Sequence, residues 1–554
     1  MKVLIKLFLW VAGVYLVVVL GSGLLIKTML SGGRIQTLVR SLNERAPVAI
    51  SVAEGSFDLV EWFRFRPVVT LSRIAIANPP GFSSRPMIEA REAGAQVALF
   101  SLFQDSVRLM RVSLREPVVN IETGPKGNTN AATVVMAKTP GGAGQEKGKS
   151  VSIDSLSVTG GTVLYQGQAA GKGLAVRDIE LSLSDFGAGK RCQVTLGARL
   201  FGGKTSRVDF KGGAGPAGTD SLPAQGSLSV VIAPAEVPRA LRDEYLGDLL
   251  REPPPAARAA FTAAMDGDLL KTLAGTGELQ LTDFAVGRSQ QARLTLAGKA
   301  PLRLAFRGLL GSPSLEVTSP GASLQLGQGR WKGSLAARYD AGRLSGQSSG
   351  SITGVKIDEM LRAFTAAKDP VSGMAEMPEY RIRFAGTNAV QIRDSLAGDG
   401  RIIVRDGKVA LFDLVGTIEA KLNSLLGGDT GKAGTTDFLK LATRFEIQNG
   451  RVTLPDLVLE SSSSSVGGQG YFGFDNALSF DLATDITGAL AAKLGGRPDS
   501  AGAAHLRVPV RVRGTLQSPK VYPDVAGMAK ATAVEKAKGL LDSFLKKRTA
   551  APAK

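Results

Sequence analysis

The clearest pattern along the chain is an alternation of apolar and polar residues with a period of two. In the stretch HLRVPVRVRG (505–514) the arginines fall on one side and the apolar residues on the other, namely Leu506, Val508, Val510 and Val512. Residues that alternate in this way lie on opposite faces of a β-strand. The stretch therefore predicts a strand with one apolar face, and that face needs a covering layer.

Segments with the same strand-like pattern recur from about residue 50 to the end of the chain, with Gly, Asn or Asp between them. Three examples are PVVTLSRIAIANPPG (67–81), DSVRLMRVSLREPVVNIETG (105–124) and SIDSLSVTGGTVLYQG (152–167). Residues of these types mark turns between short strands. The 67 glycines and 26 prolines, with only 21% charged residues, favour the same architecture over a helical or disordered chain. We therefore predict a mainly β protein.

Helical spacing of apolar residues is confined to a few segments. The clearest internal one covers 237–250, and a triple proline ends it. The C-terminal segment 525–548 is amphipathic, so we expect both to lie against the sheet as lids or end caps. Such helices could cover only part of a large sheet, so a closed two-layer sandwich and an open or curled sheet both remain open. Further helices are expected over 256–273, 356–367, 416–426 and 436–444.

The N-terminus carries a run of apolar residues that is long enough to cross a membrane. After Lys2 and Lys6, residues 7–26 contain no charge, and about twenty residues span a bilayer core as a helix. A cleaved signal peptide has a shorter apolar core, so the pattern favours an uncleaved anchor. A long, β-rich, cysteine-poor body after such an anchor is typical of the periplasm, where we expect it.

Composition excludes several kinds of chemistry. Cys192 is the single cysteine and His505 the single histidine, so disulfide frameworks, thiolate clusters and histidine-rich metal sites cannot form within the chain. The net charge of +18 is spread along strand faces and lacks the interleaved aromatics of nucleic-acid binders. No Walker-type phosphate loop is present. We expect no enzyme activity, no cofactor, no metal and no nucleic-acid partner.

The C-terminal third resembles the corresponding region of the AsmA-like family of bacterial envelope proteins. The resemblance rests on three segments in order: GDGRIIVRDGKVALFDL (398–414), RFEIQNGRVTLPDLVLESSSSSVGGQGYFGFDNALSFDLATDI (444–486) and VPVRVRGTLQSPKVYPD (508–524). RPVVTLSRIAIANPPGF (66–82) and the segment 97–130 are similar to the start of that family, although a tryptophan often found near the Asn128–Asn130 turn is missing. Residues 190–350 match only in style.

Several residues of these segments have an expected structural role. Gly407 and Gly450 suit the positive φ of two-residue hairpin turns, whereas Pro519 and Pro523 should stop the last strand. The serines 461–465 form a polar run that we interpret as a turn or a solvated strand edge.

The resemblance implies a protein anchored in the inner membrane, with its body in the periplasm, whose elongated, curled antiparallel β-sheet forms a trough. The arginines of 505–514 would face water, and the apolar face would line a groove for a phospholipid or another envelope lipid. Proteins of either membrane would be possible partners. The implied lining comprises Tyr380, Ile382, Phe384, Phe445, Ile447, Leu478, Phe480, Leu482, Leu506, Val508, Val510 and Val512.

These observations give an expected organisation and three functional hypotheses. The leading hypothesis is non-enzymatic lipid transfer between the two membranes. The second is an anchored scaffold that affects outer-membrane protein assembly without carrying lipid, and the third is an envelope glycosidase, for which the sequence singles out no carboxylate pair. The expected regions are the anchor (1–30), an N-terminal AsmA-like region (31–136), a linker or loop (137–150), a central β-groove region (151–385) with a helical insertion near 236–273, a C-terminal AsmA-like region (386–524) and a helical tail (525–554).

Overall fold

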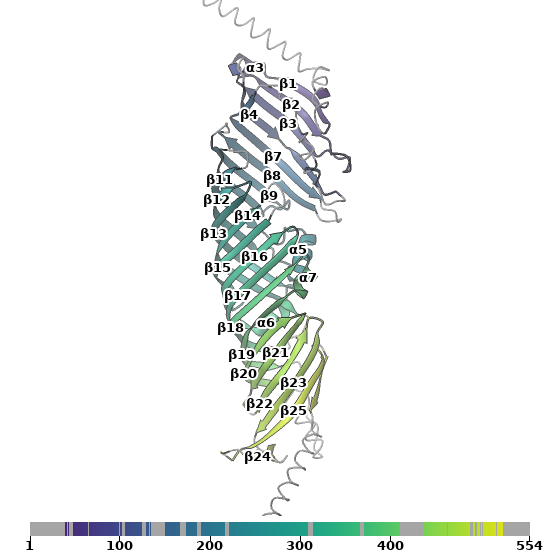
Figure 1. Cartoon of the computed structure of the whole chain (residues 1–554), viewed down its shortest axis with the longest axis vertical. Helices are drawn as coiled ribbons and strands as arrows, with labels where there is room; N and C mark the ends of the chain where they lie inside the picture. The colour runs from purple at the N-terminus through teal and green to yellow at the C-terminus, as the bar shows by residue number, and fades with distance from the viewer. Residues whose placement is uncertain are drawn as a thin grey trace, which may run out of the picture. The chain divides into compact units, whose positions relative to one another are not determined.

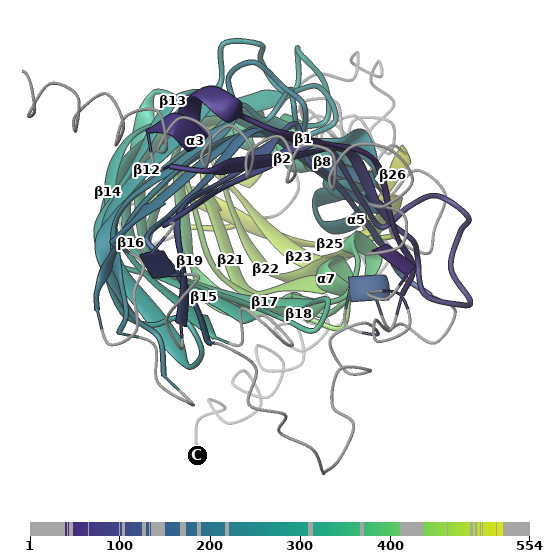
Figure 2. The same cartoon turned by 90° about the horizontal axis from the view of Figure 1, so that it is seen from above.

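A computed structural model describes most of residues 39–523, with several gaps, the longest being 134–149 and 410–435. The described chain is mainly β, as predicted (Figure 1). It divides into two compact units. Unit 1 comprises Met1–Arg242, Arg258–Gln280 and Arg303–Leu315; unit 2 comprises Asp243–Ala257, Leu281–Leu302 and Glu316–Lys554. The strands of both units curve, as Figure 2 shows.

The sheet of unit 1 begins with four antiparallel neighbours, β1 to β4, and continues through β8 to β12. Its strands are β1 (Ile50–Phe57), β2 (Val68–Ile76), β3 (Ile88–Val97), β4 (Ser106–Arg115), β5 (Val118–Glu122), β6 (Ser150–Ile153), β7 (Ser155–Gln166), β8 (Gly173–Ser184), β9 (Cys192–Leu200), β10 (Arg207–Ala214), β11 (Pro223–Ile232) and β12 (Arg258–Asp268). A short helix, α3 (Leu59–Phe63), connects β1 to β2.

The sheet is not antiparallel throughout, which corrects the expectation from the sequence. β4 pairs in parallel with β6 and β7, and β5 pairs in parallel with β7. Because β3 pairs with both β4 and β5, these two strands act as one interrupted strand, beside which β6 and β7 run. The long connection between β5 and β6 permits a parallel return, which a short hairpin cannot make.

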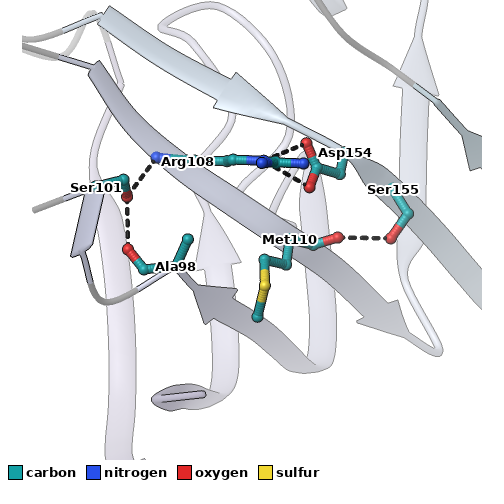
Figure 3. A network of polar contacts seen from close by, with 6 residues as sticks. All are labelled: Ala98, Ser101, Arg108, Met110, Asp154 and Ser155. Atoms are coloured by element: carbon teal, nitrogen blue, oxygen red, sulfur yellow. Dashed lines mark hydrogen bonds and ion pairs between the residues drawn. The ribbon is translucent and has the colours of Figure 1, made fainter. Parts of the chain in front are cut away.

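Polar contacts hold this parallel junction together on one side (Figure 3). Nε of Arg108 in β4 donates to both carboxylate oxygens of Asp154, at 2.9 and 2.8 Å, and the ion pair raises the pKa of the guanidinium. The hydroxyl of Ser155 donates to the carbonyl oxygen of Met110 at 2.9 Å, and that of Ser101 accepts from the backbone N–H of Arg108. These side-chain contacts add to the backbone hydrogen bonds that join the strands of the junction.

Unit 2 consists of antiparallel neighbours from β16 to β26. Its strands are β16 (Gly329–Asp340), β17 (Arg343–Lys356), β18 (Val371–Gly386), β19 (Ala397–Val409), β20 (Thr436–Gln448), β21 (Arg451–Glu460), β22 (Ser464–Gly473), β23 (Ala477–Thr487), β24 (Arg497–Pro498), β25 (Ala504–Thr515) and β26 (Ser518–Pro523). Strands β13 (Thr272–Gly287), β14 (Arg293–Arg307) and β15 (Ser314–Leu326) contribute residues to both units.

Two of the predicted helices are confirmed and two are wrong. The segment 237–250 contains α5 (Arg239–Leu246) and the 3₁₀ helix η2 (Gly247–Leu249), and 356–367 contains α6 (Ile357–Phe364). In contrast, 256–273 forms β12 and the start of β13, and 436–444 lies in β20. The alanines and leucines of those segments favour helix, but strand partners on both sides override this preference. A further helix, α7 (Ala389–Asp394), was not predicted.

Three predicted helices lie outside the described residues: the membrane anchor over 7–26, the segment 416–426 and the C-terminal segment 525–548. Among the described residues, no helix has both the length and the hydropathy needed to span a bilayer. The six regions expected from the sequence stay a prediction of chain organisation.

The turn predictions have mixed outcomes. Asn449 and Gly450, with φ of +51° and +70°, form the two-residue hairpin between β20 and β21, as expected. Gly407 instead lies within β19, where a Cβ would stand 2.4 Å from the ring of Phe438. Pro519 lies inside β26 rather than stopping a strand, because β25 turns tightly into β26. Pro523 is the last residue of β26, and the serines around Ser461 form the turn into β22.

Candidate functional site

The twelve residues predicted to line a groove lie on one face of the sheet in unit 2. Tyr380 is directly opposite Gly400, which is opposite Phe445 on the next strand. Farther along, Leu482 is opposite Val510. We call this surface the apolar face of unit 2, and the strand register alone places all twelve on it: Tyr380, Ile382, Phe384, Phe445, Ile447, Leu478, Phe480, Leu482, Leu506, Val508, Val510 and Val512.

Glycines on this face make room for aromatic rings on neighbouring strands. A Cβ on Gly400 would lie 2.6 Å from Cζ of Phe445, and one on Gly470 would lie 2.2 Å from Cδ1 of Phe480. Both rings therefore lie flat over a glycine of the adjacent strand. Such cross-strand pairing of an aromatic ring with a glycine fixes the strand register and covers the exposed backbone.

At the C-terminal end, the apolar face of unit 2 is a closed core. Val508, Val510 and Val512 are 0%, 1% and 0% exposed. They belong to one buried cluster with side chains from β18 to β23 and with Ile357 of α6. These strands are successive neighbours in the sheet, so the cluster runs continuously along the face, and Ile357 of α6 packs into it. The open groove expected along this strand is occupied by the protein's own side chains, and its role as a lipid lining stays a prediction.

The same face is less covered around β16 and β17. Leu335 and Tyr339 of β16 are 38% and 39% exposed. Tyr245, next to the end of α5, packs its ring edge against Tyr339, with the centroids 6.2 Å apart. Beside them, the hydroxyl of Tyr380 accepts a hydrogen bond from Nε1 of Trp331 at 2.5 Å and lies 2.8 Å from the hydroxyl of Ser348.

Unit 1 presents an apolar surface that the sequence analysis did not single out. One residue from each of nine strands, β2, β3, β4 and β7 to β12, forms a line of directly paired neighbours. At about 4.8 Å between strands, this line is about 38 Å long. All its members are partly exposed except the last, which is buried. We call it the apolar row: Leu71, Ala93, Leu114, Val158, Leu181, Leu196, Phe210, Leu228 and Ala263.

The signal for the apolar row was present in the sequence. The segments 173–184, 192–200 and 207–214 all alternate between apolar and polar residues, as 505–514 does. The predicted lining residues all lie in the C-terminal half of the chain, which contains most of the family-like motifs. The row could not be aligned from the sequence, because β4 joins β7 through a parallel pairing that no local pattern predicts.

The opposite face of each sheet is charged and largely neutralised by ion pairs. In unit 2, Arg381 pairs with Asp399 and Arg444 with Asp456. These side chains line a hollow of about 1500 Å³ across β15 to β21, in which basic and acidic groups alternate. Hydrogen bonds from the backbone N–H and the guanidinium of Arg444 lower the pKa of Asp456, against the opposing effect of burial. Paired charges of this kind stabilise a solvated face.

The residues considered for catalysis occupy structural positions. Nδ1 of His505 lies 3.4 Å from a carboxylate oxygen of Asp485 on the neighbouring strand. Cys192 is buried at the start of β9. Across the described part of the chain, no group of three or more histidine, cysteine or acidic side chains is arranged to hold a metal ion.

The N-terminal motifs that resemble the AsmA-like family meet in one buried polar network. Asn130, which is 0% exposed, donates to the side chain of Asn78 at 2.8 Å and to the carbonyl oxygen of Asn120 at 2.7 Å. Its own side-chain oxygen accepts from the backbone N–H of Glu122. Burial would raise the pKa of Glu122, but hydrogen bonds from Ser83 and Asn78 outweigh it and lower the pKa. The motif residues therefore hold the turn before β3 against β5.

Comparison with known families decides the relationship. A sequence model of the AsmA family matches residues 39–305. This chain is an AsmA-like protein. The match covers every strand of the apolar row and extends over 190–305, where the motifs gave only a likeness of style. Membership and the large β-sheet fit a role in the bacterial envelope. Neither a curated protein nor a solved structure matches this AsmA-like chain.

Proposed function

We propose that this AsmA-like protein is a non-enzymatic lipid-transfer protein, anchored in the inner membrane by residues 7–26, with its body in the periplasm. It would move phospholipid between the inner and outer membranes. The observation that carries the proposal is the apolar row of unit 1, in which large apolar side chains on adjacent strands stay partly exposed. A soluble domain normally covers such a continuous surface or uses it to bind a partner.

The size of the apolar row suits acyl chains. One leaflet of a bilayer accounts for about half of a hydrocarbon core about 30 Å thick, so the row, at about 38 Å, is longer than one chain. Each buried methylene contributes about 0.8 kcal/mol, so a chain would bind firmly without a shaped pocket. Because the row is uniform in chemistry, a chain could slide along it with little change in free energy. Any energy input would come from a partner or a lipid gradient.

A scaffold role, in which the protein supports outer-membrane protein assembly without carrying lipid, is the second candidate. The closed core of unit 2 favours it, because Val508, Val510 and Val512 leave no room for a ligand at that end. A native mass spectrum of the purified chain separates the two candidates. Lipid transfer predicts mass additions of one or more phospholipids that vanish after extraction; a scaffold predicts the bare chain.

A further inference from the structure

Two apolar side chains protrude at one end of the strands in unit 1. Phe100 is 71% exposed and Val60 of α3 is 63% exposed, which are higher values than those of the other large exposed apolar residues of the described chain. Both are in connections at the same strand ends, since α3 joins β1 to β2 and the segment around Phe100 joins β3 to β4. Figure 1 shows α3 at the end of β1.

The structure holds these two connections side by side. The backbone N–H of Asp58 donates to the carbonyl oxygen of Val68, and that of Val97 donates to the carbonyl oxygen of Pro67. Both bonds tie the connections to the start of β2. The two connections are therefore neighbours on a common surface, which we call the α3 end and which carries Val60 and Phe100.

A capping side chain and a buried aromatic residue hold the α3 helix in place. Asp58 caps its N-terminus by accepting from the N–H groups of Val60 and Glu61. Trp62 is only 9% exposed, and its ring packs against that of Phe57 with the centroids 5.5 Å apart. With the aromatic residues buried, Val60 faces outward on a rigid support rather than on a loose loop.

The polar residues of the α3 end suit the headgroup region of a bilayer. Arg64 is exposed and pairs with Glu61 at 2.8 Å. Asp58 keeps its negative charge while it caps the helix, so Arg64 and the exposed Arg66 together balance Asp58 and Glu61. Exposed apolar side chains beside arginines are the composition of a surface that rests among lipid headgroups.

The N-terminal chain limits how far unit 1 can lie from the membrane. Val39 is 7% exposed and packs against Val52, Leu71 and Ile74 of β1 and β2. Only residues 27–38 separate it from the expected membrane span over 7–26. Twelve residues reach at most about 40 Å when fully extended. The sheet that carries the α3 end is therefore tethered close to the bilayer.

We propose that the α3 end docks on the lipid surface of the membrane that holds the anchor, with Val60 and Phe100 inserted at the level of the headgroups. This inference rests on the anchor of the proposed function, and it adds a second, monotopic contact with the same bilayer. That contact would orient the apolar row, whose first member Leu71 lies under Val39, at the membrane from which lipid is taken.

Depth-dependent fluorescence quenching in the full-length chain tests the docking. Single cysteines at Val60→Cys and Phe100→Cys are labelled with a polarity-sensitive dye, and Cys192, which is buried, is replaced by alanine. The chain is reconstituted in protein-free vesicles of phosphatidylethanolamine and phosphatidylglycerol, three parts to one, with nitroxide groups on the acyl chains. Ser84→Cys is the matched control, because Ser84 is exposed in the β2–β3 turn at the other end of the same strands, about 27 Å away.

Docking predicts strong quenching at positions 60 and 100 and little at 84. Absent quenching at 60 and 100, or equal quenching at 84, would overturn the proposal and leave the surface to a protein partner. The native mass spectrum of the same preparation tests the proposed lipid transfer separately. Quenching at 60 and 100 without bound lipid would contradict lipid transfer and still support docking of the α3 end.

Discussion

The apolar faces of the two units have the same alternating pattern and different burial. In unit 2 the pattern ends in a dry core, where Val508, Val510 and Val512 are at most 1% exposed. In unit 1 the apolar row keeps nearly every side chain partly exposed, including Phe210 and Leu196. In unit 2 these valines pack in one buried cluster with side chains of β18 to β23 and with Ile357 of α6. Alternation therefore identifies an apolar face, but only tertiary packing decides whether the face is a core or a binding surface.

The largest effect should come from a charge placed in the closed core. Val510→Asp buries a carboxylate with no partner, which costs several kcal/mol and is comparable with the stability of a whole domain. We expect unit 2 to unfold, as measured by thermal denaturation followed by circular dichroism. Arg511→Asp, which changes the neighbouring residue on the charged face, is the control and should melt close to the wild type. A folded Val510→Asp variant would mean that this end is an open groove.

The same substitution on the apolar row should be tolerated. Phe210 is partly exposed, so Phe210→Asp loses only part of its apolar burial, about 2 kcal/mol, and leaves its carboxylate in contact with water. The folded state should survive while lipid co-purified with the chain falls, as measured by mass spectrometry of extracts. Lys211→Asp on the opposite face is the matched control and should keep its lipid. Unfolding of Phe210→Asp would make the row an ordinary core.

Hydrogen bonds from the backbone to side chains should contribute more to stability in unit 1 than in unit 2, because the sheet of unit 1 has an open face. The carboxylate of Glu236 accepts hydrogen bonds from the backbone N–H groups of Lys204, Thr205 and Ser206. Burial would raise its pKa, but the hydrogen bonds led by those from Ser206 lower it to about 2. The folded pKa is below the unfolded one, so this stabilisation is complete above about pH 4.5 and is lost as the pH falls toward 2.

Glu236→Gln should therefore lower the stability of unit 1 at neutral pH by about 1–2 kcal/mol. The deficit relative to the wild type should shrink as the pH falls from about 4.5 to 2. Urea denaturation across that pH range measures it. Glu89→Gln, the same chemical change at an exposed position of β3 in unit 1, is the control and should show no such convergence. A pH-independent deficit at Glu236 would contradict the assigned cause.

The smallest effect is expected at the parallel junction. Arg108→Gln removes an exposed ion pair with Asp154, and such pairs contribute little because water screens them. The melting temperature should fall by less than it does in Glu236→Gln, and added salt should reduce the difference further. A loss as large as that of Glu236→Gln would show that the junction carries much of the stability of unit 1.

Much of the architecture follows from local pattern, and the remainder depends on contacts between distant segments. The alternation predicted the strands, and apolar spacing predicted α5 and α6, each of which lies within its expected segment. The sequence predicted a helix over 436–444, yet strand pairing on both sides holds these residues in β20. The parallel pairing of β4 with β7 depends on the long connection after β5 and has no local signal.

The candidate site was likewise predictable from the sequence only in part. The sequence was sufficient to place Tyr380, Phe445 and Val510 on a common face, because strand parity needs only alternation and register. It was insufficient to distinguish a filled face from an open one, since that outcome depends on packing between distant segments, such as that of Ile357 of α6 in the buried cluster. The apolar row of unit 1 was missed because its alternating side chains look like those of a core. Nothing in the sequence indicates that they stay partly exposed.

Photo-crosslinking inside cells tests the central claim, that the apolar row contacts lipid, most directly. A benzophenone amino acid replaces Phe210, whose ring it resembles, and in a second strain it replaces Lys211, the next residue of β10 on the charged face. After irradiation, the account predicts phospholipid attached to the chain at position 210 and none at position 211. Equal adducts at both positions, or none at 210, would contradict it.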